Sequence, residues 1–170
     1  METTLPTAVV SSQTKMARMP SSVPEPQLSA WRAVLNAHAA LVDRIERELA
    51  AADLPPLSWY DVLWAVRRTP SRRVRMAQLA DSLTLSRGGL TKLAARLERE
   101  GLLRREPAEN DGRGFYAVIT DEGSAMVRRM WTVYARVLRD AFASAVEPGE
   151  AEVIVSALDR AKRAARPVPD

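Results

Sequence analysis

Two short amphipathic segments joined by a tight link constrain the fold more than any other feature of this sequence. In both segments apolar residues recur at the spacing of one helix face: Met76, Leu79, Ala80 and Leu83, then Leu90, Leu93, Ala94 and Leu97. Ser86 is a favourable N-cap for the second helix, and Gly101 is a typical residue just beyond a helix C-terminus. The pattern therefore predicts a helix-turn-helix.

A β-hairpin is predicted directly after this pair of helices. Residues 102–106 and 115–119 are short strand-like runs, and the residues between them are rich in turn formers, including Asp111-Gly112. A hairpin in this position would form a wing beside the helix-turn-helix.

One more helix is predicted just before the pair. Ser58 and Asp61 fit the capping box that opens a helix, and apolar residues follow as its buried face: Trp59, Val62, Leu63 and Val66. Arg67 and Arg68 fall in its last turn, where the helix dipole favours cations.

Longer helices are predicted at both ends of the chain. From Gln27 to about Ala51 apolar positions alternate in steps of three and four, which predicts packing against another helix: Leu28, Trp31, Leu35, His38, Val42, Ile45 and Leu49. A helix capped by Thr120 or Asp121 runs to about Ala145. A last helix begins at Pro148 and carries further apolar positions: Ile154, Val155, Leu158 and Ala161. The predicted fold class is mainly α (α+β).

Missing residue types exclude several classes of function. The 170 residues contain no cysteine, which excludes disulfides and Cys-ligated metals. They contain one histidine, His38, so a Ser-His-Asp triad or a multi-His metal site within one chain is not expected. His38 is expected to be a core or interface residue with a satisfied hydrogen bond or, alternatively, a titrating switch at the dimer interface. Without a phosphate loop or a paired acid/base motif, the chain is expected to be no enzyme and to need no cofactor or metal.

The start of the sequence gives further expectations. It lacks the apolar core of a secretory signal, and the chain has no apolar run long enough to span a membrane. A cytoplasmic protein without membrane contact is therefore expected. Residues 1–26, rich in Pro, Ser and Thr, are expected to form a disordered tail.

Positive charge is concentrated in the predicted helix-turn-helix and wing. Residues 67–114 contain twelve Lys and Arg against six Asp and Glu, a net charge of +6, whereas the whole chain carries +4. The remainder is therefore −2. This localisation indicates a nucleic-acid partner more strongly than the total charge does.

The second helix of the pair has residues suited to reading DNA. Arg87, Lys92 and Arg96 could donate to guanine or phosphate oxygens, and the Thr91 methyl could touch a thymine methyl. The first turn would carry a free Ser86 hydroxyl and two glycines, Gly88 and Gly89. Because glycines have no side chains, this end of the helix could come close to the bases in a major groove. Three arginines before the pair are expected at phosphates: Arg72, Arg73 and Arg75. The alternative, an ordinary solvated basic face, does not account for the adjacent helix-turn-helix and wing.

The sequence resembles the MarR family of winged-helix regulators. The resemblance rests on a set of short motifs: residues 57–63 (LSWYDVL), 79–80 (LA), 85–93 (LSRGGLTKL), 96–105 (RLEREGLLRR), 111–114 (DGRG) and 119–123 (ITDEG). It implies a MarR-like domain over residues 27–166, with a winged helix-turn-helix lobe at 57–120. It also implies an obligate homodimer formed by residues 27–54 and 121–166.

The resemblance also implies roles for individual residues. The wing motif places Arg113 in the minor groove, where narrow A·T-rich DNA attracts a guanidinium. Two recognition helices about 34 Å apart would enter successive major grooves of a pseudo-palindrome. The family commonly binds small aromatic or anionic effectors between its two regions, and the residues expected there are Trp31, Trp59, Tyr60, Trp64 and Arg68. The alternative, that the tryptophans are core residues, is at least as well supported for Trp59.

These observations predict a homodimeric regulator of transcription that binds double-stranded DNA, most simply a repressor released by a small ligand. The alternative is a non-enzymatic helical protein-interaction module with a basic face and no specific DNA target. A module of this kind would have the same apolar helix faces, but it would not explain the wing, Arg113 or the localised positive charge.

Overall fold

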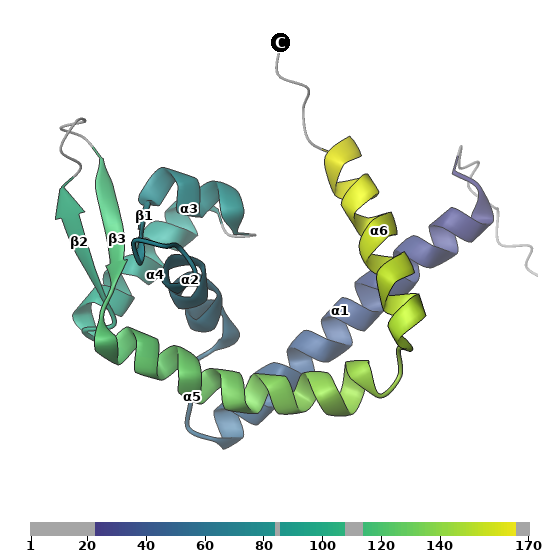
Figure 1. Ribbon diagram of the computed structural model, residues 1–170, viewed down its shortest axis with the longest axis horizontal. Helices are drawn as coiled ribbons and strands as arrows, with labels where there is room; N and C mark the ends of the chain where they lie inside the picture. The colour runs from purple at the N-terminus through teal and green to yellow at the C-terminus, as the bar shows by residue number, and fades with distance from the viewer. Residues whose placement is uncertain (1–22, 84–85, 108–113, 166–170) are drawn as a thin grey trace, which may run out of the picture. The chain divides into compact units, whose positions relative to one another are not determined.

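The computed structural model describes residues 23–83, 86–107 and 114–165. Most of them are helical, with one small antiparallel sheet, as the sequence predicts (Figure 1). The elements follow in this order: α1 (Glu25–Ala51), α2 (Leu57–Arg67), β1 (Arg73–Arg75), α3 (Met76–Ser82), α4 (Arg87–Arg99), β2 (Leu103–Pro107), β3 (Phe115–Ile119), α5 (Asp121–Leu138), the π-helical turn η1 (Arg139–Ala143) and α6 (Pro148–Ala164). Residues 1–22, which hold most of the predicted tail, lie outside the described residues.

The sheet confirms the predicted hairpin and adds a strand that the sequence pattern did not predict. The strand order is β1-β3-β2, with Leu103 opposite Ile119 in the hairpin and Val74 opposite Ala117 in the added pair. Because β1 has only three residues and two of them are arginines, it lacks the length and the apolar run that signal a strand.

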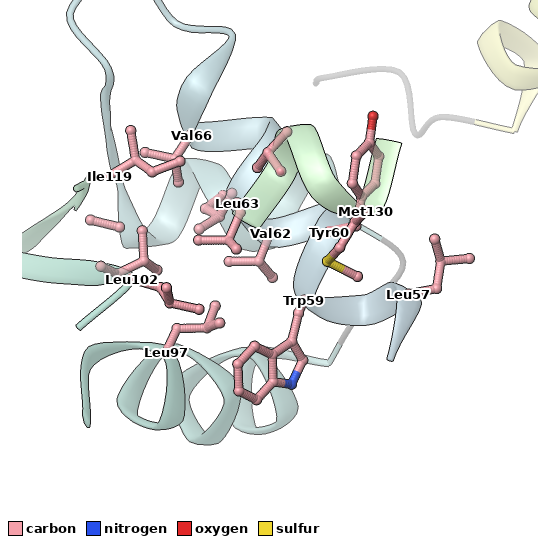
Figure 2. Packing of buried hydrophobic residues seen from close by; sticks show 14 of the residues in the cluster. Leu57, Trp59, Tyr60, Val62, Leu63, Val66, Leu97, Leu102, Ile119 and Met130 are labelled. Carbon is pink, nitrogen blue, oxygen red and sulfur yellow. The ribbon is translucent and has the colours of Figure 1, made fainter. Parts of the chain in front are cut away.

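Helix α2 is the centre of the hydrophobic core. Six of its eleven residues are buried, on more than one face: Leu57, Trp59, Tyr60, Val62, Leu63 and Val66. It contacts α3, α4, α5 and two strands of the sheet. Figure 2 shows Trp59 extending beside α4, whereas Tyr60 lies beside α5. The four residues predicted to be buried are buried, but the buried surface of α2 extends beyond the single face that the sequence predicted.

The predicted capping box at Ser58 is wrong. Helix α2 begins one residue earlier, at Leu57, and no side chain of its N-cap residue Pro56 is available to accept a hydrogen bond. The Leu57 N–H donates instead to a carboxylate oxygen of Glu46, on α1, at 3.1 Å. A carboxylate at a helix N-terminus satisfies a free N–H and complements the dipole, so a residue distant in sequence replaces the local cap.

The predicted starts of α4 and α5 are confirmed by their caps, whereas α5 ends at Leu138 and not near Ala145 as predicted, because the π-helical turn η1 follows it. The Ser86 hydroxyl accepts the Gly89 N–H at 3.1 Å, and the Thr120 hydroxyl accepts the Gly123 N–H at 2.9 Å. Thr120 also donates to the Gly101 carbonyl at 2.8 Å, which ties the end of α4 to the start of α5. Gly101 has φ +71°, the left-handed conformation that glycine adopts without strain.

The two terminal helices keep much of their apolar surface exposed. The chain divides into compact units at residues 1–35 and 36–170, and α1 runs through the boundary. Within the first unit Trp31 is 57% exposed, whereas in the second Ile45 and Leu49 of α1 are buried. Helix α6 has no buried residue, although the predicted Pro148 start is confirmed.

Candidate nucleic-acid interface

Helix α4 separates a buried apolar stripe from an exposed polar face. Leu90, Ala94 and Leu97 are buried in the core, as predicted. Thr91, Lys92, Arg96 and Arg99 are exposed on the remaining faces. This amphipathic division leaves cationic donors on the surface while the helix is held rigidly from beneath.

The first turn of α4 is narrow because two glycines, Gly88 and Gly89, follow Arg87 at its start. A Cβ at Gly88 would meet nothing within 4 Å, so the backbone there is open to an approaching surface. At Gly89 a Cβ would lie 3.1 Å from the Ser86 hydroxyl, close to the cap that starts the helix. The prediction of a free Ser86 hydroxyl is therefore wrong, since that oxygen accepts the Gly89 N–H.

Two predicted DNA contacts cannot be placed. Arg113 lies outside the described residues, and so does the side chain of Arg87. Both stay predictions.

Arg96 is held against the protein rather than extended freely. Its guanidinium lies over the Trp59 ring, 5.2 Å from the ring centroid. A cation above an indole is attracted by the ring quadrupole, so this contact fixes the C-terminal half of α4 on α2. Sequence periodicity could not predict the contact between Arg96 and Trp59, because the two residues lie on different helices.

Strand β1 adds a second basic surface at the base of the wing. The guanidinium groups of Arg73 and Arg75 lie 4.7 and 5.4 Å from the centroid of the Tyr116 ring. Arg75 Nε also donates to the Tyr116 hydroxyl at 3.3 Å, and Arg73 pairs with Glu106 at 3.7 Å. Tyr116 thus holds two cations side by side on the sheet.

Arg72 is engaged away from this surface. Its guanidinium donates to the Ser124 hydroxyl and pairs with Asp121 at 3.5 Å, both on α5. To contact a DNA phosphate as predicted, the Arg72 guanidinium would have to give up these contacts within the chain. The sequence did not reveal them, because 52 residues separate Arg72 from Ser124.

Comparisons with known proteins agree with this geometry. A sequence model of the MarR family matches residues 52–114. The chain resembles the crystal structure of Sco3205, a MarR family transcriptional regulator from Streptomyces coelicolor in complex with DNA, with a TM-score of 0.80 and 28% identity. That match covers 89% of this chain and 95% of Sco3205. The middle of the chain therefore matches the MarR family of transcriptional regulators, and the fold of the chain is similar to that of MarR family structures.

Two HTH-type transcriptional regulators are similar to this chain over shorter segments. YkoM of Bacillus subtilis, an uncharacterized HTH-type transcriptional regulator, is 31% identical over 87 residues, which cover 51% of this chain and 56% of YkoM. PecS of Dickeya dadantii, an HTH-type transcriptional regulator, is 33% identical over 82 residues, which cover 48% of this chain and 49% of PecS. The chain thus spans about half the length of these relatives.

Four of the five predicted effector residues lie in the second unit, where Tyr60 and Trp64 are neighbours. Tyr60 and Trp64 stack at 6.1 Å with an interplanar angle of 9°. Trp59 lies against Arg96 of α4 instead. Trp31 belongs to the first unit, so its predicted role stays a prediction. Arg68 lines a cavity with Trp64.

The structure places two aromatic residues of α5 beside Tyr60, a contact that the sequence did not predict. Trp131 lies nearly parallel to Tyr60, 6.2 Å between centroids, and Tyr134 meets Tyr60 edge-on at 5.3 Å. Their separation of three residues places them on one helix face, a signal that was available in the sequence.

Two ionisable groups on α2, Tyr60 and Asp61, have pKa values that are raised above their ordinary values. Burial raises the pKa of Tyr60 to about 12, with Tyr134 and Asp61 adding to the effect and Arg67 opposing it. Desolvation, and then repulsion from Glu46, raises the pKa of Asp61. Tyr60 is therefore a neutral hydrogen-bonding group near neutral pH.

Neither a group of metal-ligating side chains nor a membrane-spanning helix is found in the described part of the chain. Among residues 23–83, 86–107 and 114–165 no group of three His, Asp or Glu side chains could hold a metal ion. No described helix is both long enough and apolar enough to cross a bilayer.

Proposed function

We propose that this chain binds double-stranded DNA as a homodimer and regulates transcription, most simply as a repressor that a small ligand releases. The observation that carries the proposal is helix α4, which is capped by Ser86, opened by two glycines and exposes Thr91 and Lys92 beside a wing. Sco3205, which has a similar fold over 89% of this chain, is itself bound to DNA in its crystal structure. The proposed role is non-enzymatic.

The exposed face of α4 would enter a major groove. Lys92 and Arg87 would donate to guanine edges or nearby phosphates, while the Thr91 methyl would lie near a thymine. Arg73 and Arg75, held by Tyr116, are placed on the sheet where they could meet phosphates and fix the register. Arg113 would follow the minor groove at the wing tip.

Homodimer formation is supported by the terminal helices. Four large apolar residues of α6 are exposed in the single chain: Val153, Ile154, Val155 and Leu158. Exposed apolar surface of this extent is typical of an interface with another chain. A twofold pair would present two α4 helices to one face of a pseudo-palindromic duplex.

The proposal can be tested by fluorescence anisotropy on duplexes taken from the DNA flanking the protein's own gene. Lys92→Ala should lose about 1–3 kcal/mol of binding free energy and relax the preference at one position in each half-site. Lys162→Ala, which removes the same charge from exposed α6, is the matched control and should bind normally. Arg113→Ala should weaken binding without unfolding the dimer.

Salt dependence separates the proposal from its alternative. Sequence-specific binding should fall steeply with salt, because neutralised phosphates release counterions. Equal, weak binding to every duplex, with Lys92→Ala and Lys162→Ala indistinguishable, would favour a helical protein-interaction module with a basic face.

A further inference from the structure

Arg72 has a backbone conformation that is unfavourable for its residue type. Among the described residues, the non-glycine residues with positive φ are Asp53 and Arg72, each at 52°. A short polar side chain such as that of Asp53 tolerates the left-handed region, whereas a residue with a longer side chain adopts it at a cost in free energy. Such a conformation persists only where the surrounding structure holds it. The surroundings of Arg72 must therefore stabilise it.

The Arg72 backbone joins the end of α2 to the sheet. Its N–H donates to the Thr69 carbonyl at 2.9 Å, which closes the turn after α2. Its carbonyl accepts the Ile119 N–H at 3.2 Å, which extends the pairing of β1 with β3 by one residue beyond Arg73 opposite Val118. The conformation of Arg72 therefore fixes the point at which the chain enters the sheet.

The Arg72 side chain joins the same point to α5. Its guanidinium donates to the hydroxyl of Ser124, which is 3% exposed, and lies 3.5 Å from the Asp121 carboxylate. Because the Asp121 side chain is 93% exposed, water screens that ion pair, and the bond to the buried Ser124 is the stronger link. We call the hydrogen bond between the Arg72 and Ser124 side chains the Arg72–Ser124 tether.

The tether lies next to other positive charges. Arg72 and Ser124 line a cavity of about 510 Å³ together with three further arginines: Arg67, Arg68 and Arg128. Repulsion within this arginine-lined cavity favours moving the Arg72 guanidinium out to solvent. The position of that guanidinium therefore depends on its hydrogen bond to Ser124, and loss of the Ser124 hydroxyl should release it.

We propose that Arg72 is a positioning residue for DNA binding, and that it acts through Ser124 rather than by touching DNA. The inference rests on the proposed function. Strand β1 begins at the next residue and carries Arg73 and Arg75, the two cations proposed to meet phosphates. With its backbone on β3 and its side chain on α5, Arg72 holds these cations at a fixed place relative to α5.

Ser124→Ala separates a positioning residue from a phosphate contact. Ser124 is too deeply buried to touch DNA, so its substitution acts only through its neighbours. If Arg72 positions β1, loss of the hydroxyl should weaken DNA binding about three- to tenfold, the size expected for residues that act through a network. If Arg72 binds a phosphate, the released guanidinium should leave DNA affinity unchanged or raise it. An unchanged or raised affinity would overturn the proposal.

The double variant tests whether Arg72 acts through Ser124. Arg72→Gln should weaken DNA binding about as much as Ser124→Ala does, and the two changes together should cost no more affinity than one alone. Additive losses would show that Arg72 contacts DNA independently of Ser124, and would contradict the proposal.

Arg72→Gly separates positioning from folding. Glycine adopts the left-handed conformation without strain, so Arg72→Gly should melt at a higher temperature than Arg72→Gln. Its DNA affinity should nevertheless be as low as that of Arg72→Gln, because both variants lack the tether. If DNA affinity instead rose with the melting temperature, Arg72 would have only a structural role and the proposal would be wrong.

A matched pair of residues for control variants lies on α6. The Arg160 guanidinium donates to the Ser156 hydroxyl at 2.8 Å, and both residues are exposed. Arg160→Gln and Ser156→Ala remove the same kind of hydrogen bond outside the lobe, and each should keep the parent affinity in fluorescence anisotropy. A loss at this pair as large as that at Arg72 and Ser124 would contradict the proposal.

Hydrogen exchange measures the tether without DNA. The Ile119 amide, which donates to the Arg72 carbonyl, should exchange at least about threefold faster in Arg72→Gln and Ser124→Ala than in the parent or in Arg160→Gln. If the parent binds no duplex, the proposed function fails and the role in DNA binding fails with it, whereas faster exchange still supports the tether. Unchanged Ile119 exchange in both variants, in a parent that does bind DNA, would overturn the proposal alone.

Discussion

The winged helix-turn-helix lobe and the last helix differ in how they bury apolar residues. In the lobe, α2 is surrounded by α4, α5 and the sheet, and Leu63, Leu90 and Leu97 are completely enclosed. In α6, Val155 and Leu158 remain exposed, and no residue is buried. The lobe can therefore be stabilised by its own chain, whereas the apolar surface of α6 needs a partner to cover it.

This difference assigns different roles to the lobe and to the terminal helices. A rigid lobe keeps the exposed face of α4 in a fixed geometry, which direct reading of bases requires. Terminal helices that associate with a second chain would set the spacing between two such lobes. Each of the following changes tests one side of this comparison.

The largest effect is expected from truncating a core leucine. Leu63→Ala should lower the free energy of unfolding by about 2–5 kcal/mol, because it removes buried methyl groups and leaves a cavity. The loss should be the same at every protein concentration in chemical denaturation. Leu158→Ala should instead change stability only in a concentration-dependent way, since its side chain would be buried by association. If Leu63→Ala and Leu158→Ala lowered the free energy of unfolding equally, and at every protein concentration, the comparison between the lobe and α6 would be contradicted.

Charge in the apolar face of α6 should break the dimer. The double variant Ile154→Glu/Leu158→Glu should be monomeric by light scattering and should bind operator DNA at least about 100-fold more weakly, because the second half-site is no longer linked to the first. The thermal unfolding of the lobe should remain cooperative. A dimer that persists with full DNA affinity would show that another surface joins the chains.

Two glycine substitutions compare the place where α5 packs on the lobe with the start of α6. A Cβ at Gly123 would overlap the Leu102 carbonyl oxygen and lie 2.9 Å from the Ile119 side chain, so Gly123→Ala should cost about 1–3 kcal/mol. A Cβ at Gly149, at the start of α6, would meet nothing within 4 Å. Gly149→Ala should therefore be neutral or stabilise the helix by up to about 1 kcal/mol in thermal unfolding. A loss at Gly149 equal to that at Gly123 would contradict the comparison.

The smallest effect is expected from the pH dependence of the lobe. The pKa of Asp61 is raised above its ordinary value of 3.8 by desolvation and by Glu46, so ionising it costs stability in the folded state. That cost is present at pH values above the raised pKa and disappears below the ordinary one. Asp61→Asn should thus raise the melting temperature at pH 7, with a difference that shrinks as the pH falls toward 3.

The exposed residue Asp159 on α6 is the control for this measurement. Asp159→Asn removes the same charge and should change the melting temperature little at either pH. A lower melting temperature for Asp61→Asn at pH 7 would show that the charged carboxylate stabilises the fold.

Local signals in the sequence predicted much of the lobe. Ser86, Gly101 and Thr120 each act within a few residues of their own position, so their caps could be placed from spacing alone. The hairpin followed from turn residues between two strand-like runs.

The missing features depend on tertiary contacts. The cap that Glu46 provides for Leu57 acts across 11 residues, and the arginine-lined cavity joins residues 64–72 to residues 121–128. Strand β1 forms only because β3 offers an edge to Arg73–Arg75. No periodicity within one segment encodes contacts of this kind.

The most direct test of the central claim is the mass of the protein–DNA complex by light scattering, on a duplex chosen by footprinting the DNA beside the protein's own gene. The account predicts two chains per duplex and two protected half-sites about one helical turn apart. One chain per duplex, or no complex with any duplex at low salt, would contradict it.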